Sequence, residues 1–284
     1  MLVTVFTPTY NRASLLPRLF ESLEAQSVPD FEWLIVDDGS TDETERVVNA
    51  FHSSFPMRYI KKKNGGKHTA INLAVKQAAG ELFFIVDSDD SLPTKSIEMI
   101  CKYWNQVKCD ASFAGVSGYM AHYDGRIVAY GGDYTVLDCN ALDFRYKYGM
   151  SGDMAEVFKT SVLCEYPFPE IEGEHFCPEA LVWNRIAQRY RLRYFRKVVY
   201  YCDYLAGGLT DRIVNLRMES PVASTTHYCE LSQYQIPFQQ KVKAAINYWR
   251  FYACLQDKKK APKLHWKWFW TRPLGVLMHQ RDKR

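Results

Sequence analysis

The segment Leu82-Phe83-Phe84-Ile85-Val86 runs directly into Asp87-Ser88-Asp89-Asp90. An uninterrupted apolar run of this length is typical of a strand that is buried on both faces of a parallel sheet. Three carboxylates at the end of such a strand repel one another unless a cation compensates their charge. Carboxylate oxygens are the ligands that Mg²⁺ and Mn²⁺ prefer. The segment therefore predicts a buried strand followed by a divalent-cation site, and an acidic loop that caps the helix near Pro93 is the alternative interpretation.

The rest of the first half continues this alternation of strand and helix. Apolar runs predict strands at residues 2–6, 33–36, 57–60 and 82–86. Apolar residues at helical spacing predict helices in residues 15–23, 47–51 and 70–78. This pattern is typical of an α/β fold in which helices flank both faces of a mainly parallel sheet. Because such sheets bind their ligands at the carboxyl ends of the strands, we expect the functional residues there.

The second half has shorter elements. It predicts strands at residues 112–119, 127–130, 192–195 and 198–202, as a mixed extension of the sheet, and a helix at 178–189. After Gly207-Gly208 the pattern is helical, around residues 221–232 and 238–256. We therefore expect a C-terminal helical extension on the α/β domain.

Composition and charge exclude several classes of protein. The chain has 284 residues, of which 47% are hydrophobic and 24% charged, so disorder and a small disulfide scaffold are excluded. Its longest apolar runs fall far short of the roughly 20 residues that span a bilayer. The eight cysteines form no C-x-x-C pair and no secretory signal is visible, which predicts a cytoplasmic protein.

The net charge of +4 is unevenly distributed along the chain. The segment from residue 258 onward carries +8, so the rest of the chain carries −4. This acidic remainder argues against nucleic-acid binding.

Three further polar clusters follow predicted strands or open predicted helices. Residues 7–12 supply an aromatic ring and polar groups, residues 37–42 supply carboxylates, and Asn64-Gly65-Gly66-Lys67-His68 opens a helix whose amides suit an anion. The alternative interpretations are a plain turn for the first cluster and an Asx turn with helix capping for the second. Capping explains residues 40–42 better than it explains Asp38.

Together these clusters resemble a known family. Thr9-Tyr10-Asn11-Arg12, Val36-Asp37-Asp38-Gly39-Ser40, the segment 64–72 and Asp87-Ser88-Asp89-Asp90 occur in the order found in the family 2 inverting glycosyltransferases of the GT-A fold. The resemblance is strong over residues 1–90 and extends weakly to residue 205. It implies a catalytic domain at 1–210, with a nucleotide-sugar-binding half at 1–110 and an acceptor-binding half at 111–210. Residues 211–284 would form the helical C-terminal region.

The resemblance also implies roles for individual residues. Asp89 would bind Mn²⁺ or Mg²⁺ on the diphosphate, because Asp87-Ser88-Asp89 matches the D-x-D motif of the family. The implied donor-binding residues are Pro8, Tyr10, Arg12, Asp38, Lys67, Asp87 and Ser88. Asp153 lies in the region where the family contacts its acceptor.

The implied catalytic base is Glu179, which begins a segment that ends in Trp183-Asn184-Arg185. The family commonly has Asp at this position with an acidic neighbour, whereas this chain has Glu preceded by Pro178. Glu174, like Glu172, is an alternative base. Stabilisation of the first helical turn explains Glu179 without catalysis.

The reaction implied is transfer of a sugar, with inversion, from a nucleoside-diphosphate sugar, usually a UDP-sugar, to a hydroxyl of a saccharide or lipid-linked saccharide. Surface-polysaccharide or glycolipid synthesis is the implied setting. A non-catalytic nucleotide-sugar-binding module and a nucleotidyltransferase are the competing hypotheses. The mixture of cations and aromatic rings from Lys258 to Trp270 predicts peripheral contact with an anionic membrane on its inner face, unless these rings pack on the catalytic domain.

Overall fold

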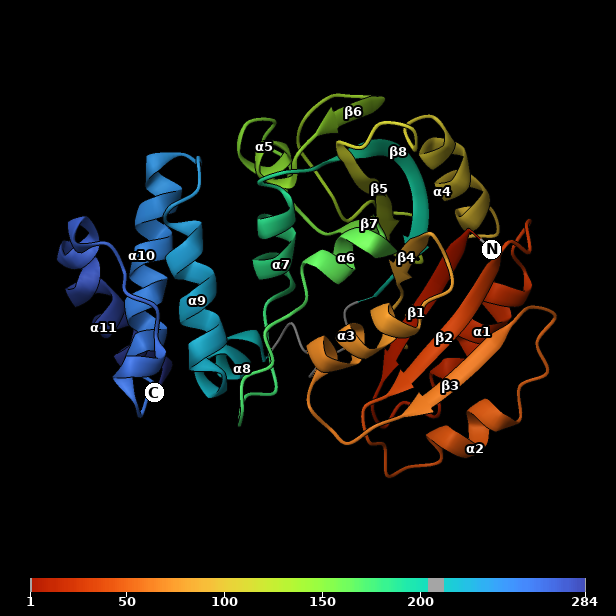
Figure 1. Cartoon of the computed structure of the whole chain (residues 1–284), viewed down its shortest axis with the longest axis horizontal. Coiled ribbons are helices and arrows are strands. Elements are labelled where there is room, and N and C mark those ends of the chain that lie inside the picture. The colour runs from red at the N-terminus through yellow and green to blue at the C-terminus, as the bar shows by residue number, and fades with distance from the viewer. Residues whose placement is uncertain (1, 204–211, 284) are drawn as a thin grey trace. The chain divides into compact units, whose positions relative to one another are not determined.

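Within residues 2–203 and 212–283, which the structure describes, eight strands form one sheet in the order β3-β2-β1-β4-β7-β5-β8-β6 (Figure 1). This structure is a computed structural model. The four strands that come first in the chain pair in parallel: β1 (Val3–Thr9), β2 (Phe31–Asp37), β3 (Met57–Lys61) and β4 (Leu82–Ile85). The others are β5 (Phe113–Ala121), β6 (Val136–Cys139), β7 (Met154–Lys159) and β8 (Arg191–Tyr201). They form a mixed extension, because β7 is antiparallel to β4 and β5 whereas β8 is parallel to β5.

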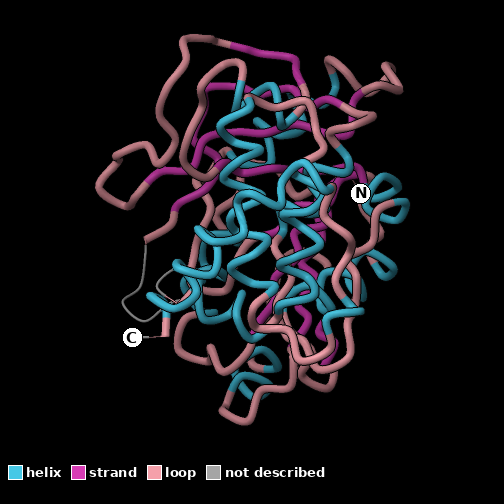
Figure 2. The backbone as a smooth tube through the Cα atoms, turned by 90° about the vertical axis from the view of Figure 1, so that its left-hand side faces the viewer, coloured by secondary structure: helices cyan, strands magenta, loops and turns pink. Residues whose placement is uncertain are grey.

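Helices cover both faces of this sheet, which is why most side chains of β1, β2 and β4 are buried (Figures 1 and 2). On one face, Val5 and Trp33 share an apolar cluster with Leu19 of α1. Side chains alternate along a strand, so Phe6 points to the other face, where α3 contacts β1 and β2. The helices around the sheet are α1 (Leu16–Glu24), α2 (Thr44–Asn49), α3 (Lys67–Gln77), α4 (Ser96–Asn105), α5 (Ala141–Tyr146) and α6 (Thr160–Glu165). The predicted α/β class and the flanked sheet are confirmed.

The chain packs as two units. Unit 1 comprises residues 1–167 and 186–203 and contains the whole sheet, and unit 2 comprises residues 168–185 and the chain from 204 onward. The predicted division differs, because it assigned residues 168–185 to the domain 1–210. The boundary at 210–211 and the turn at Gly207-Gly208 lie outside the described residues. Since packing does not assign function, the functional division remains a prediction.

Unit 2 is helical, as predicted for the C-terminal extension. Its elements are α7 (Glu179–Ile186, whose last residue belongs to unit 1), α8 (Ile213–Glu219), α9 (Pro221–Leu231), α10 (Phe238–Tyr252), the short 3₁₀ helices η1 (Lys258–Lys260) and η2 (Trp266–Thr271), and α11 (Arg272–Asp282). Tyr248 and Trp249 of α10 pack with Cys229, Leu264 and Trp268 in its core. None of the helices in the described residues combines the length and apolar character needed to cross a bilayer.

The second half of the sheet departs from the sequence predictions in three ways. Residues 127–130 form only isolated bridges, through Ile127 and Tyr130, instead of a strand. The strands predicted at 192–195 and 198–202 are one continuous strand, β8, whose pairing with β5 has register shifts. β6 and β7 carry polar residues within them and were not predicted. Pairing with distant strands, which leaves no local pattern, decides these elements.

Candidate active site

The loops that follow β1, β2 and β4 meet at the carboxyl edge of the sheet. The backbone N–H of Asp38 donates to the carbonyl of Thr9 over 2.8 Å, and that of Val86 donates to the carbonyl of Phe6 over 2.8 Å. Thr9 and Asp37 are register partners at the ends of β1 and β2. The polar clusters predicted at this edge from the sequence therefore lie on neighbouring strands.

Asp38 connects the loop after β2 to the glycine turn before α3. Its buried carboxylate accepts the backbone N–H groups of Gly65, at 3.0 Å, and Gly66, at 2.7 Å. The ammonium group of Lys62 lies 2.7 Å from Oδ1 of the same carboxylate. A carboxylate accepts about four hydrogen bonds, so three protein donors leave it capacity for a further donor. The sequence did not indicate Lys62, which lies in a run of three lysines without a distinguishing pattern.

Asp37, which precedes it, shapes the turn instead. Its carboxylate accepts the backbone N–H of Ser40 at 2.7 Å and the hydroxyl proton of Tyr59. Gly39 in this turn has φ +87°, and a Cβ there would lie 3.0 Å from the backbone nitrogen of Asn64. The turn therefore needs glycine, and the two adjacent aspartates have different structural roles.

The loop after β1 leaves Tyr10 available to a ligand. The side chain of Tyr10 is 48% exposed, and Pro8 is half-buried at the end of β1. Asn11 has φ +53°, and its Oδ1 accepts the N–H of Thr41 at 2.8 Å. Arg12 is half-buried and donates its backbone N–H to Thr44. Thus Asn11 joins this loop to the one after β2, and the predicted roles of Pro8, Tyr10 and Arg12 remain predictions.

The three carboxylates after β4 lie in different surroundings. Oδ1 of Asp87 is 2.7 Å from the ammonium group of Lys67, the first residue of α3. Asp90 is buried and its Oδ2 accepts the hydroxyl of Tyr200 at 2.7 Å. Burial, together with the charge of Asp87, raises the pKa of Asp90 to about 8. The ammonium group of Lys67 therefore compensates part of the negative charge of this loop, and burial favours the neutral form of Asp90.

Asp89 and Ser88 complete this turn. Ser88 is buried, Asp89 is half-buried, and the carbonyl of Asp89 accepts a hydrogen bond from the guanidinium of Arg18. Arg18 also lies over the ring of Tyr123, with 4.7 Å to its centroid. Neither Arg18 nor Tyr200 was predicted, since both approach the turn from distant segments.

The carboxylates of this turn fit a metal that arrives with a diphosphate. In the part of the chain that the structure describes, no group of three or more His, Cys, Asp or Glu side chains is arranged to hold an ion. Mg²⁺ and similar ions often use one or two protein carboxylates and complete their shell with phosphate oxygens and water. Asp87, with a side chain 39% exposed, and Asp89 provide that number from one turn.

The two candidate bases belong to unit 2, where they differ in their contacts. The carboxylate of Glu174 accepts the backbone N–H groups of Val222, at 2.6 Å, and Ala223, at 2.9 Å. These groups lie in the first turn of α9, so Glu174 caps that helix. Burial raises the pKa of Glu174, although both hydrogen bonds lower it. Glu179 is half-buried and begins α7.

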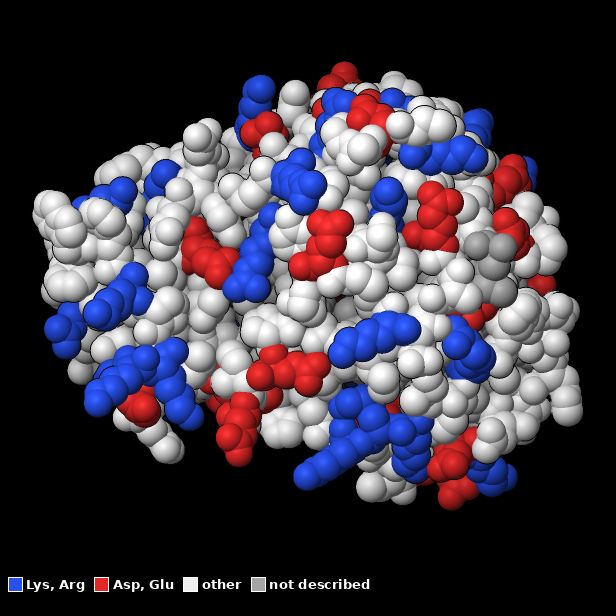
Figure 3. All heavy atoms as spheres, viewed as in Figure 1, with Lys and Arg blue, Asp and Glu red and all other residues white. Residues whose placement is uncertain are grey.

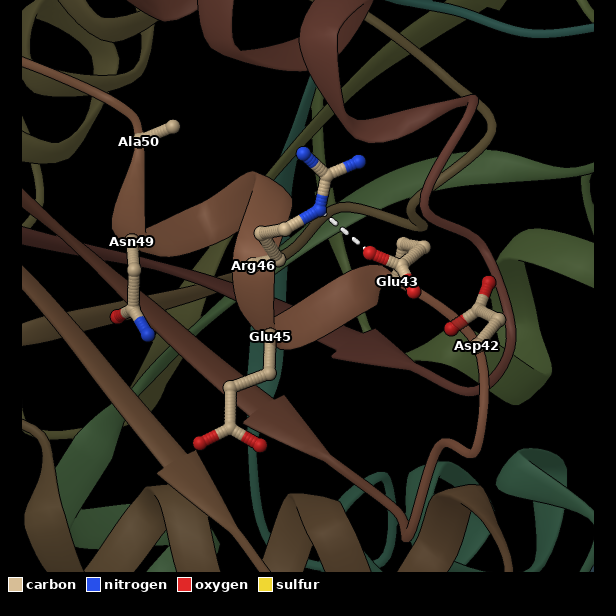
Figure 4. Close-up of a pocket in the computed structure, with 6 residues that line it drawn as sticks. All are labelled: Asp42, Glu43, Glu45, Arg46, Asn49 and Ala50. Atoms are coloured by element: carbon tan, nitrogen blue, oxygen red, sulfur yellow. Dashed lines mark hydrogen bonds and ion pairs between the residues drawn. The ribbon is translucent and has the colours of Figure 1, made fainter.

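Two other features lie apart from these loops in the sequence. Asp153 is exposed and directly precedes β7. Figure 4 shows a surface depression along α2, lined by Asp42, Glu43, Glu45, Arg46, Asn49 and Ala50. Its lining includes none of the predicted site residues, so we do not assign it to the site.

The family model described as Glycosyl transferase family 2 matches residues 4–145, half of the chain. The chain belongs to glycosyltransferase family 2. A chondroitin synthase of Pasteurella multocida is 39% identical over 102 residues, which are 36% of this chain and 11% of that protein. An uncharacterized glycosyltransferase of Rickettsia felis is 36% identical over 104 residues, 37% of this chain and 17% of the relative. The chain therefore matches less than a fifth of the length of either relative.

Solved structures share the fold of this family 2 chain. The structure of S. aureus TarS 1-349 in complex with UDP has a TM-score of 0.65 at 20% identity and covers 90% of this chain and 73% of that one. A mannosyltransferase from Pyrobaculum calidifontis, solved with GDP-Man and Mn²⁺, has a TM-score of 0.60 at 18% identity and covers 99% and 88% of the two chains. The expected glycosyltransferase fold is confirmed.

The family match covers one side of the predicted site. All the predicted donor-side residues from Pro8 to Asp89 lie within residues 4–145. Asp153, Glu174 and Glu179 lie beyond it. The family match therefore spans the predicted donor residues and ends before Asp153 and the two candidate bases, and the roles of all these residues remain predictions.

Proposed function

We propose that this family 2 chain transfers a sugar from a nucleoside-diphosphate sugar, with UDP as its nucleotide, to an acceptor hydroxyl with inversion at the anomeric carbon. The observation that carries the proposal is the meeting of three loops at the carboxyl edge, which brings Asp38 to the end of β1 and ties Asp87 to α3. The relatives with this fold support it, because the TarS structures hold UDP and UDP-GlcNAc.

The nucleoside binds between the ends of β1 and β2. Tyr10 stacks on the nucleobase. Asp38 accepts an N–H of the nucleobase, because its three protein donors leave the carboxylate able to accept one more hydrogen bond. Lys67 and Arg12 contact the phosphates, and Asp87 and Ser88 contact the ribose or the sugar. The ion pair with Asp87 orients the ammonium group of Lys67, so little side-chain entropy is lost when phosphate binds.

Asp89 would hold Mn²⁺ or Mg²⁺. Such an ion acts as a Lewis acid that stabilises the charge of the departing diphosphate. A GDP-Man and Mn²⁺ complex of a protein with this fold supports a divalent ion here.

Glu179 is the base in this proposal. Its carboxylate takes the proton of the acceptor hydroxyl while the oxygen forms a bond to the anomeric carbon. The bond from that carbon to the phosphate oxygen breaks, and its electron pair leaves with the nucleoside diphosphate. Glu174 is less suited to this role, because two backbone N–H groups occupy its carboxylate.

The acceptor is a saccharide or a lipid-linked saccharide in surface-polysaccharide or glycolipid synthesis, and Asp153 contributes to its binding. The chondroitin synthase and poly(ribitol-phosphate) β-N-acetylglucosaminyltransferase among the relatives support a saccharide-type acceptor. The proposal includes peripheral attachment to the inner face of an anionic membrane.

Calorimetric titration of UDP, with and without Mn²⁺, tests the donor site without knowledge of the acceptor. We expect Mn²⁺-dependent binding that Asp89→Asn abolishes and that Asp133→Asn, at a fully exposed carboxylate, leaves unchanged. Failure of UDP, GDP and other nucleotides to bind would overturn the proposal. Binding of UDP without donor hydrolysis or transfer would instead identify a nucleotide-sugar-binding module, in which Glu179 does not act as a base.

A further inference from the structure

Helix α11 packs on α10 through a narrow strip of its surface. Thr271, Gly275 and His279 are buried, and they recur every four residues along one side. A Cβ on Gly275 would lie 2.5 Å from the carbonyl oxygen of Ile246 in α10, so the two backbones approach closely at this point. Asp282 pairs with Arg250 of α10 at the end of the same strip. These contacts fix which side of α11 faces α10.

The remaining surface of η2 and α11 is exposed and mainly apolar. Trp266 is 75% exposed, Leu277 63%, and Phe269 and Trp270 56% each. We define the α11 surface as the exposed apolar residues Trp266, Phe269, Trp270, Pro273, Leu274, Val276, Leu277 and Met278. Four of these residues, Phe269, Pro273, Val276 and Leu277, line one surface depression. Contiguous exposed apolar area of this kind marks an interaction site in a folded protein.

Not every ring of the tail contributes to this surface. Trp268 is 2% exposed and packs in the core of unit 2 with Trp249. The expectation that the whole aromatic tail contacts a membrane is therefore corrected for Trp268, whose role is in packing. The exposed rings on either side of Trp268 belong to the α11 surface.

The segment that carries the α11 surface is also rich in exposed cations. Between residues 258 and 283 the exposed ones are Lys258, Lys259, Lys260, Lys263, Lys267, Arg272, Arg281 and Lys283. The acid in this segment is Asp282, and Arg250 already neutralises it. In Figure 3, the region where Figure 1 draws α11 is covered mainly by blue and white spheres.

We propose that the α11 surface docks on an anionic lipid membrane. Aromatic and aliphatic side chains enter the boundary between headgroups and acyl chains, while Lys and Arg side chains contact lipid phosphates. A symmetric contact with a second copy is disfavoured. In a twofold dimer the same surface of both copies forms the interface, so the cations of one copy would lie against those of the other. The inference extends the membrane attachment in the proposed function, but it does not require sugar transfer.

Flotation of the full chain with lipid vesicles tests this assignment. The vesicles contain phosphatidylcholine, with or without phosphatidylglycerol. We expect binding that requires phosphatidylglycerol and decreases with salt. The double variants Trp270→Ser/Leu277→Ser and Arg272→Gln/Arg281→Gln should each bind at least about tenfold more weakly.

Matched controls come from exposed residues of unit 1. Ile127→Ser/Tyr130→Ser removes apolar area, and Lys95→Gln/Lys108→Gln removes two charges. Both should bind as the parent does. Circular dichroism and urea unfolding establish that each variant is folded before flotation is interpreted.

Three results would overturn the proposal: absence of flotation, equal binding to vesicles without phosphatidylglycerol, or an equal loss in the controls. A dimer in light scattering that Trp270→Ser/Leu277→Ser dissociates, without vesicle binding, would assign the α11 surface to a second copy. Because flotation needs no nucleotide, its failure is separate from failure of UDP to bind.

Discussion

The hydroxyl of Tyr200, near the end of β8, donates to Oδ2 of Asp90 over 2.7 Å. The oxygen of this hydroxyl also accepts the backbone N–H of Asp87 at 2.9 Å. Burial of the ring raises the pKa of the Tyr200 hydroxyl well above its ordinary value, so it stays protonated as a donor. One side chain thus holds both ends of the turn that contains Asp89.

Tyr200→Phe should lower the free energy of unfolding by about 1–3 kcal/mol, because it leaves two polar groups of the turn without this partner. Mn²⁺-dependent binding of UDP should also weaken, since the turn that carries Asp89 loses its support. Urea unfolding and calorimetry measure the two effects. Tyr201→Phe is the matched control, and an unchanged stability of Tyr200→Phe would show that the bond contributes nothing.

Glu174→Gln and Glu179→Gln should separate a structural from a catalytic carboxylate. Glu174 caps α9 through two backbone N–H groups, so its variant should lose about 1 kcal/mol of stability and retain turnover. Loss of a general base should reduce the turnover of Glu179→Gln by about 10²–10⁴-fold with little change in stability.

Steady-state transfer or donor hydrolysis, measured beside urea unfolding, checks both expectations. The reverse result, in which Glu174→Gln is folded but inactive and Glu179→Gln is active, would move the base to Glu174. A loss of turnover in both variants with equal loss of stability would make neither carboxylate the base.

Gly275→Ala should destabilise the chain by about 1–3 kcal/mol. Alanine is the better helix former, but its Cβ would lie 2.5 Å from the carbonyl oxygen of Ile246 and from the Cβ of Trp249. Thermal or urea unfolding measures the change. Gln280→Ala on the exposed side of α11 should stay within about 0.5 kcal/mol of the parent. A gain in stability for Gly275→Ala would contradict the close packing of α11 on α10.

His227 should make the protein less stable in mild acid. Burial and the nearby charge of Arg217 lower the pKa of His227 to about 3, whereas an unfolded chain has a histidine pKa of about 6.5. As the pH falls below about 6.5, the unfolded chain takes up a proton that the folded chain does not, so stability decreases. This contribution is absent above that pH and amounts to about 2 kcal/mol at pH 5.

His227→Gln should therefore reduce the difference in unfolding free energy between pH 7 and pH 5 by about 2 kcal/mol. Urea unfolding at the two pH values measures it. His52→Gln, at an exposed histidine of unit 1, is the control and should keep the pH dependence of the parent. An identical pH dependence in His227→Gln would mean that His227 is protonated in the folded protein.

The sequence alone determined the α/β class and the candidate donor residues. Buried parallel strands are continuous apolar runs, and the polar residues at their carboxyl ends follow them directly, so both features are local and readable. For this reason Asp38 and Asp87 could be expected at one edge of the sheet, and that edge is observed. The C-terminal helices were predictable on the same ground of spacing.

The partners of these residues were decided by the tertiary structure. Tyr200 reaches Asp90 across 110 positions of the chain, and Asp38 binds the turn at Gly65 and Gly66 that belongs to another loop. Likewise, Trp268 is buried while Trp266 is exposed, although both lie in the same aromatic run. Residue type and spacing predict the local secondary structure of a segment and the chemistry of its side chains. Which side chain is paired, capped or left exposed depends on contacts between distant segments, and these form only when the chain folds.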